Sequence, residues 1–544
     1  MSLPTTHKLF EVPELLNAIC KYSGCQHSPQ LLRVSRAFFL AGVPLVWQKV
    51  VGVQNLLRLL PGVSLGSNAG VHRSSKPRGY QEHIMITIHG LGEATDFTRF
   101  DLYARFVKRL EVFSPNTSGY QIKRWRQLSE QAQRRVFLPS LLELTIAPSS
   151  SLHPNVFLWI RTFISPSLTS IVVEAESEGR FSTIPGLVAK SLLGHIEATC
   201  HNLQRLQLFT AATEDCETTS ERTELAIADF WEHSFFERLG GLRLQKLGCT
   251  TELLSFDWIH LLGEFPTLKS LDLYTVHCDI ADTQPEDLPH LEHFGIHFAS
   301  PIDVELIAEL GLLRGLKSLK MSFKEVVSPL VGDGWETSII LSISRDSPEL
   351  TKLDINVGDA CDCIPEMSSF RPLGALPIAE VYLRGGINVE NDQMEDLAET
   401  WPNVIRFELW DTYEVLGLEK LRRFTTFPRL QHLALGVSWY GVIPQSIAPA
   451  EPSHTLRTFE VLNHDHSHAG LDVTLLAQYL LSLWPNLESV RWPQVDNLPR
   501  MIETGSNEAM KTLSSVISSQ RNFNRLRTRI IEECGLSMLD KLLK

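Results

Sequence analysis

A six-residue phrase in which apolar and polar positions alternate recurs along most of the chain. It has the form Leu-x-x-Leu-x-Leu or an apolar equivalent, in which the fourth and sixth residues are apolar and the third and fifth are usually polar. A period of two predicts a β-strand that is buried on one face. The fourteen copies start at residues 107, 141, 168, 203, 244, 268, 291, 316, 350, 378, 404, 430, 456 and 487.

The segments between these phrases have apolar spacings near 3.6 residues, which predicts helices. Several of them end at a proline, as in Trp401-Pro402 and Trp484-Pro485. Proline stops a helix and favours an extended conformation at the residue before it. The helices predicted in this way cover 223–236, 302–315, 391–401 and 472–484.

The period identifies a repeat architecture. From residue 244 the phrases follow one another at steps of 24, 23, 25, 34, 28, 26, 26, 26 and 31 residues, mostly within or close to the period of leucine-rich repeats. One such unit cannot bury its own apolar face, so the units must stack. We expect an α/β solenoid over 83–500, with a parallel sheet on the concave face and helices on the convex face. Longer steps indicate insertions, and the acidic, Thr-rich segment 211–222 is interpreted as a surface loop.

The two ends of the chain lack the repeat phrase. Residues 1–60 have helical spacings without strand alternation and predict a unit of three short helices. Residues 61–82 are rich in Gly, Ser and Pro and are interpreted as a linker. Residues 501–544 carry helical spacings that fit a capping helix pair, with a partner-binding helix as the alternative.

The N-terminal segment resembles the F-box over roughly residues 9–51. The matching pieces are Val12-Pro13-Glu14-Leu15-Leu16, then Leu31 to Phe38 with the sequence LLRVSRAF, and then Pro44-Leu45-Val46-Trp47. Together with the repeats, the segments 97–112 and 163–173 are similar to the large family of fungal F-box proteins with degenerate leucine-rich repeats.

This resemblance implies a non-enzymatic substrate receptor of a cullin-RING (SCF-type) ubiquitin ligase. The F-box would dock a Skp-type adaptor on the cullin scaffold, and the repeats would bind a protein substrate that the sequence does not identify. The residues expected to bind the adaptor are Pro13, Leu15, Leu16, Ile19, Leu32 and Val34. The alternative is a repeat scaffold with no link to ubiquitin, in which these helices only cap the solenoid.

Composition and charge favour protein partners. The formal net charge is −13, and no long basic run provides the electrostatic basis for binding nucleic acid or an anionic membrane. Nine scattered cysteines fit a reducing compartment. The first residues carry no apolar leader, and the segment 475–484 is too short and too polar to span a bilayer. We therefore expect a cytoplasmic or nuclear protein.

Chemical motifs are sparse. The sequence has no nucleophile elbow, phosphate loop, His-Glu-x-x-His or dinucleotide-binding motif, so we expect neither an enzyme nor a cofactor. His464, His466 and His468 form a cluster that could hold a metal, but turn-forming neighbours favour an exposed loop. Cys361 and Cys363 have no second pair at zinc-site spacing. We predict no metal site.

The concave face is the expected substrate surface, because the third, fifth and seventh residues of each phrase point away from the core. Tyr, Trp and Arg are enriched in interface hot spots. The strongest candidates for substrate contact are Tyr382, Arg384, Arg406 and Trp410, with Tyr274 and His297 as a secondary patch. The alternative is that the charged members of these columns pair across strands and only stabilise the sheet.

Overall fold

The structure is a computed structural model of the whole chain. The described residues are 12–23, 30–68, 82–92, 95–114, 117–147, 156–174, 184–211, 234–251, 262–263, 265–275, 288, 290–299, 301–309, 311–323, 335–357, 367–385, 393–410, 416–438, 452–462, 472–491, 512–519 and 521–522. They divide into two compact units, Met1–Cys278 and Asp279–Lys544. The architecture is α/β, and fifteen of the described strands are parallel strands of repeat type.

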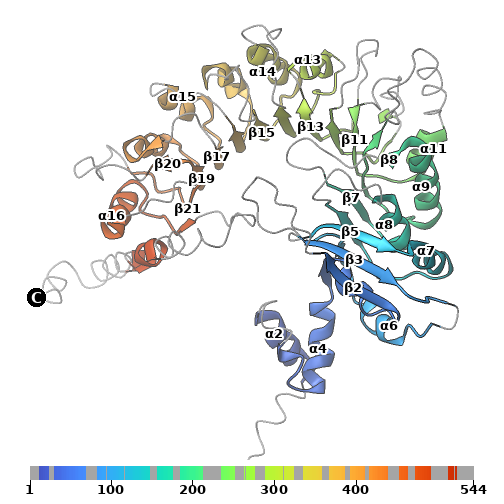
Figure 1. Cartoon of the computed structure of the whole chain (residues 1–544). Coiled ribbons are helices and arrows are strands. Elements are labelled where there is room, and N and C mark those ends of the chain that lie inside the picture. The colour runs from blue at the N-terminus through green and yellow to red at the C-terminus, as the bar shows by residue number, and fades with distance from the viewer. Residues whose placement is uncertain are drawn as a thin grey trace, which may run out of the picture. The chain divides into compact units, whose positions relative to one another are not determined.

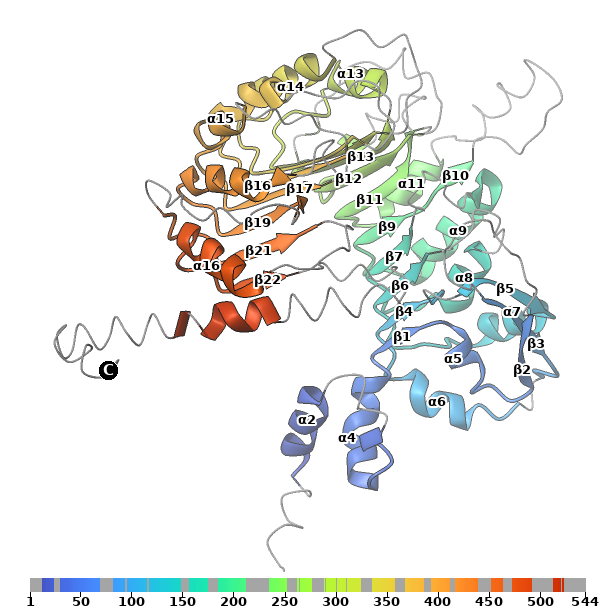
Figure 2. The ribbon, with the colours of Figure 1, turned by 60° about the vertical axis from the view of Figure 1, so that its left-hand side comes forward.

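The first unit contains seven of these strands (Figure 1), and their order in the sheet follows the sequence, as the labels in Figure 2 show. They are β1 (Lys49–Val51), β4 (Arg109–Glu111), β6 (Glu143–Ile146), β7 (Ser170–Val173), β9 (Arg205–Gln207), β11 (Lys246–Thr250) and β12 (Ser270–Tyr274). The accompanying helices are α5 (Gln54–Leu57), α6 (Thr98–Ala104), α7 (Trp125–Arg134), α8 (Val156–Phe163), α9 (Gly186–Thr199) and α11 (Ser234–Gly241). A short parallel pair is formed by β8 (Ile184–Pro185) and β10 (Thr210–Ala211).

The second unit contains the other eight strands in sequence order. They are β13 (His293–Ala299), β14 (Ser318–Phe323), β15 (Lys352–Asn356), β16 (Glu380–Arg384), β17 (Arg406–Trp410), β19 (His432–Leu435), β21 (Thr458–Val461) and β22 (Ser489–Arg491). The connecting helices are α13 (Pro301–Glu309), α14 (Trp335–Asp346), α15 (Gln393–Thr400) and α16 (Val473–Leu483), with 3₁₀ helices η2 (Met367–Ala375) and η3 (Leu418–Thr426). A second short pair joins β18 (Leu416–Gly417) to β20 (Val437–Ser438).

The strand prediction is confirmed for all fourteen phrases, because each strand begins at the third residue of its phrase. In β16 the fourth and sixth phrase positions, Val381 and Leu383, are fully buried. Neighbouring strands pair at the same phrase position, so that Glu380 lies opposite Arg406. The buried side chains therefore stack in rows against the helices. The other face of each sheet carries the third, fifth and seventh positions, and we call it the open face.

The repeats begin earlier than the sequence predicted. Residues 49–60 were assigned to the N-terminal helical segment, but β1 already pairs in parallel with β4 and is followed by α5. The first repeat was missed because its phrase, which starts at Trp47, reads WQKVVG and contains no leucine. Its fourth residue, Val50, is buried, and valine favours a strand, so the strand forms without the leucine motif.

The predicted linker at 61–82 is corrected in part. Residues Val63–Asn68 form β2, which pairs antiparallel with β3 (Glu82–Ile88), and β3 pairs in parallel with β5 (Thr117–Lys123). Gly62 starts this side sheet with a φ of +73°, and a Cβ there would lie 1.9 Å from the carbonyl oxygen of His89. Gly62 therefore permits a close approach of two backbone segments. Its presence in a Gly-rich and Ser-rich segment was interpreted as a sign of a flexible linker. Residues 69–81 lie outside the described part.

The N-terminal unit contains the helices α2 (Pro13–Tyr22) and α4 (Arg36–Val46), and residues 30–31, where the middle helix was expected, are also helical. Pro13 occupies the first turn of α2, and the Ser35 hydroxyl caps α4 by accepting from Phe38 N at 3.2 Å. Their small core consists of Leu16, Cys20 and Phe38, with Leu31, Ala37 and Ala41 packed against it. We call α2 and α4, with the turn at 30–35, the helix pair.

The remaining predictions concern helix ends and the C-terminus. The helix predicted at 302–315 ends at Glu309, and Gly311 follows with a φ of +77°. The prediction at 223–236 falls mostly outside the described residues, as do the 212–222 part of the proposed insertion loop and 492–511. Within the expected C-terminal cap, residues 512–519 are helical, and Leu513 and Ile517 are buried. Among the described helices, none has the length and apolarity needed to cross a membrane.

Candidate functional site

The helix pair exposes an apolar stripe. Val12, Leu15, Ile19 and Tyr22 follow one another at intervals of three or four residues along α2, and all four are exposed. Tyr22 is the most exposed, at 86% of its surface. Val34 and Leu40 add 66% and 61% exposed side chains from the turn and from α4. Exposed large apolar side chains along one face of a helix are typical of a protein-docking surface.

The structure separates the six predicted adaptor-binding residues into two groups. Pro13, Leu15, Ile19 and Val34 are exposed, as a docking surface requires. Leu16 is only 3% exposed and belongs to the core of the helix pair, which corrects its assignment. Leu32 is half-buried, and a Cβ on Gly42 would lie 2.5 Å from its Cδ2. The sequence interpretation missed Tyr22 and Leu40, although Tyr22 continues the helical spacing of Leu15 and Ile19.

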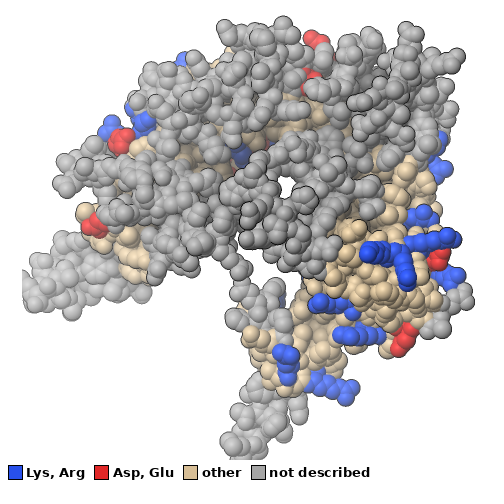
Figure 3. Space-filling model, in the orientation of Figure 1, with Lys and Arg blue, Asp and Glu red and all other residues tan. Residues whose placement is uncertain are grey.

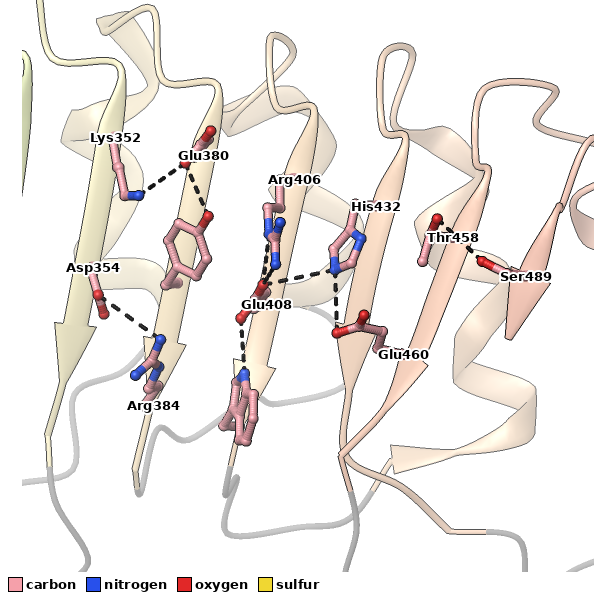
Figure 4. A network of polar contacts seen from close by, with 12 residues as sticks. Lys352, Asp354, Glu380, Arg384, Arg406, Glu408, His432, Thr458, Glu460 and Ser489 are labelled. Carbon is pink, nitrogen blue, oxygen red and sulfur yellow. Dashed lines mark hydrogen bonds and ion pairs between the residues drawn. The ribbon is translucent and has the colours of Figure 1, made fainter. Parts of the chain in front are cut away.

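The open face of the second unit carries a network of polar contacts (Figure 4). Lys352 Nζ lies 3.2 Å from Glu380 Oε2 and 4.8 Å from the centre of the Tyr382 ring. The Tyr382 hydroxyl donates to Glu380 Oε2 at 3.0 Å. Burial alone would raise the pKa of Glu380, but the hydrogen bonds from Tyr382 and Lys352 outweigh it and lower that pKa. Glu380 is therefore held as an anion by its neighbours.

Glu408 is the centre of the next group. Its carboxylate is buried and accepts from Arg406 Nε at 2.7 Å and from Trp410 Nε1 at 3.1 Å. His432 Nε2 lies 3.8 Å from Glu408 Oε1 and 3.6 Å from Glu460 Oε2. The hydrogen bond with His432 lowers the pKa of Glu460. These residues lie on three successive strands, β17, β19 and β21, and form a ladder of alternating charge.

The four main candidates for substrate contact do come together. Tyr382 and Arg384 on β16 lie directly opposite Glu408 and Trp410 on β17. The Arg384 guanidinium is 5.6 Å from the centre of the Trp410 ring, and Arg406 is 5.5 Å from that of Tyr382. All four side chains are half-buried. Arg384 and Arg406 already face aromatic rings or carboxylates. The structure thus contains the pairing within the sheet that was the alternative to a role in substrate contact, and this pairing does not depend on a partner.

The secondary patch does not have the exposure expected of it. In the first unit, Tyr274 is 8% exposed, its ring lies 4.7 Å from that of Phe209, and its hydroxyl accepts from Gln207 Nε2 at 3.1 Å. In the second unit, His297 is also 8% exposed. Seventh-position side chains were expected to project into solvent. Tyr274 instead packs against neighbours on the sheet, and His297 is buried, which corrects their assignment as contact residues.

The open face of the first unit has a polar pocket of about 340 Å³ that sequence reasoning did not find. It lies across β6, β7, β9 and β11, which are side by side in Figure 2. Its lining residues are mostly polar or charged: Glu143, Thr145, Thr169, Ser170, Val172, Glu174, Gln204, Arg205, Gln245 and Lys246. Burial and the nearby Glu111 raise the pKa of Glu174, and Arg205 opposes this shift.

Basic side chains gather over the part of the first unit that carries α6 and α7 (Figure 3). The sequence around α7 contributes Lys123, Arg124, Arg126 and Arg134. Arg126 pairs with Glu130 one turn away at 2.9 Å, and both are well exposed. Pairs of this kind stabilise a solvated helix face by only a few tenths of a kcal/mol. We assign this surface no binding role.

Catalytic and metal chemistry have little support in the described part of the chain. No group of His, Cys, Asp or Glu within it could hold a metal ion. The His464, His466 and His468 cluster and the Cys361 and Cys363 pair lie outside the described residues. Cys20, Cys200 and Cys249 are buried free thiols, and burial raises the pKa of Cys200 to about 11. A thiol with a raised pKa is a poor nucleophile.

Comparisons with known proteins give no family for the chain. No family model matches it, and neither does any curated protein. Among solved structures, a chain of the Toll–Spätzle complex from Drosophila is similar with a TM-score of 0.25 and 11% sequence identity. The match covers 76% of this chain and 63% of that chain, so this chain spans less than two thirds of the matched structure.

Proposed function

We propose that this chain is the non-enzymatic substrate-recognition subunit of a cullin-RING (SCF-type) ubiquitin ligase. The helix pair docks a Skp-type adaptor on the cullin scaffold, and the open faces of the two sheets bind a protein substrate in the cytoplasm or nucleus. The observation that carries this proposal is the apolar stripe on α2, which is exposed on a unit whose own core contains only a few side chains.

Burial energetics supports docking at this stripe. A fully buried Leu or Ile side chain contributes about 1.5 to 3 kcal/mol relative to an exposed one. Leu15 and Ile19 are 41% and 40% exposed, and Val34 and Leu40 are 66% and 61% exposed, although the interior of the helix pair has few other apolar groups. A partner that covers these side chains would supply the burial that the pair lacks. A helical cap needs a polar outer face, which is the opposite arrangement.

The proposed substrate surface includes Tyr382, Arg384, Arg406 and Trp410. Half-buried aromatic and guanidinium groups that are already oriented by neighbours lose little conformational entropy when a partner binds. Their internal pairing with Glu408 and Asp354 means that a partner would gain specificity more than affinity from the charges. The scaffold alternative, with no link to ubiquitin, uses the same surface and differs only at the helix pair.

The test is capture of a Skp-type adaptor by the double variant Leu15→Asp/Ile19→Asp. We expect affinity to fall by at least a factor of about 100, since hot-spot side chains cost about 2 kcal/mol or more each when lost. The matched control is Leu341→Asp/Leu475→Asp, which places the same charges at exposed leucines of α14 and α16 and should bind as the parent does. Equal adaptor affinity in parent and L15D/I19D would exclude the F-box role and leave the scaffold alternative.

A further inference from the structure

Arg205 is an unusual cation on the open face. Five other basic residues occupy the same strand position, and each has an ion pair: Lys49 with Glu111, Arg109 with Glu143, Lys246 with Asp272, Lys352 with Glu380, and Arg406 with Glu408. Among the described residues, no carboxylate lies within ion-pair distance of Arg205. Its side chain lines the polar pocket and is exposed.

The two neighbours of Arg205 in the sheet are hydrogen-bond donors. Lys246 lies directly opposite on β11, and Ser170 lies directly opposite on β7. Two like charges directly opposite each other destabilise a sheet. Asp272 compensates Lys246 at 2.5 Å, whereas Arg205 has no ion pair among the described residues. The pocket therefore has a row of hydroxyl, guanidinium and ammonium groups along one line of the sheet, with the Gln204 and Gln245 side chains beside it.

The acidic residues of the pocket compete only weakly for this row. Glu143 is engaged by Arg109 Nε at 3.1 Å. Glu174 and Arg205 interact through their charges, and Arg205 opposes the rise that burial causes in the pKa of Glu174, but the two form no ion pair. Neither carboxylate is positioned as a full counter-ion for Arg205, so a place for an external anion remains.

We infer that this pocket binds an oxyanion carried by an extended segment of a protein partner, with Arg205 as the main contact and Lys246 and Ser170 as supporting donors. Guanidinium groups pair with carboxylates and phosphoryl groups through charge-assisted hydrogen bonds, so either group satisfies the chemistry. The inference rests on the proposed function only in that the open face holds a protein. The new element is the kind of partner side chain that the first unit selects, namely one that carries an oxyanion.

The experiment uses immobilised full-length chain and four pools of blocked nonapeptides. Flanking positions are randomised, and the central residue is Asp, phosphoserine, Ser or Lys. We expect the Asp pool, the phosphoserine pool or both to be retained about tenfold better than the Ser pool, because one charge-assisted contact gives an advantage of that size. The preference should vanish in Arg205→Gln and persist in part in Arg205→Lys.

Lys352→Gln is the matched control, because it removes one cation from the same strand position in the other unit and lies outside the pocket. It should keep the full preference. Retention of the phosphoserine pool alone would identify a phosphoryl group as the natural ligand, and retention of the Asp pool would show that a carboxylate suffices. Equal retention of all pools by the parent, or an unchanged preference in R205Q, would overturn the inference. Adaptor capture measured on the same preparations reports the proposed function separately.

Discussion

The helix pair and the repeat sheets differ in which side chains they leave exposed. The pair has a core of three buried residues and leaves apolar side chains outside. The sheets bury rows of Leu, Ile, Val and Phe and leave polar side chains outside, with ion pairs such as Lys352 to Glu380 and Arg406 to Glu408 among them. An exposed apolar face is stabilised when a partner covers it, whereas an exposed polar ladder is stable without one. This difference is the reason why we propose docking at the pair and selective recognition at the sheets.

The two regions also differ in how a partner would gain binding free energy. At the helix pair, the proposed docking would gain free energy by removing apolar area from water. On the open face of the second unit, a partner must compete with contacts such as Arg406 to Glu408 and Lys352 to Glu380. The free-energy cost of desolvating such ion pairs is about as large as the gain from forming new ones. Arg205 in the first unit differs, because no carboxylate lies within ion-pair distance of it among the described residues.

The largest expected effect is in the repeat core. Phe407→Ala removes a fully buried ring that lies 6.2, 5.8 and 6.0 Å from the rings of Trp401, Phe424 and Phe427. We expect urea denaturation to show a loss of about 3 to 5 kcal/mol, as for other buried phenylalanines. The exposed change Leu341→Ala should cost less than about 0.5 kcal/mol. A loss in F407A below 1 kcal/mol would mean that this core is less tightly packed than the structure shows.

A smaller and more local effect is expected in the helix pair. Leu16→Ala should lower the stability of the pair by about 2 to 3 kcal/mol, near the lower end for a buried leucine because so small a core can partly collapse. Hydrogen exchange should quicken in 13–22 and 36–46 while the repeat strands keep their protection, since repeats are stabilised by their neighbours. Leu15→Ala, on the exposed face of the same helix, is the control. Uniform loss of protection along the chain would contradict the separation of the two regions.

The smallest expected effect on stability is at the proposed substrate surface. Arg384→Ala/Trp410→Ala removes a cation stacked over an indole and the hydrogen bond to Glu408, and we expect a cost of about 1 kcal/mol in thermal or urea unfolding. Co-purifying partners should be lost while adaptor capture remains. A variant that keeps every partner at parental affinity would move the substrate site away from β16 and β17.

The sequence predicted the strands well because their signal is local. The alternation in segments such as Glu380–Arg384 depends only on which side chains are apolar, and burial follows the same parity. β1 was missed because the phrase that contains Lys49–Val51 has no leucine. β2 was missed because it is stabilised by antiparallel pairing with β3, which comes later in the chain. The close contact with His89 at the start of β2 depends on the positive φ of Gly62.

By itself, the sequence determined the period of the repeats, the parity of buried and outward positions, and the location of the short helical unit before them. Only the tertiary structure decided which outward side chains are available. Leu15 and Leu16 are adjacent leucines of one helix, yet one is exposed and the other forms the core, because helix α4 covers only one side of α2. Arg205 and Arg406 occupy the same phrase position, yet only Arg406 has a carboxylate beside it among the described residues. Burial and charge pairing depend on neighbours from distant parts of the chain, and a local pattern does not contain them.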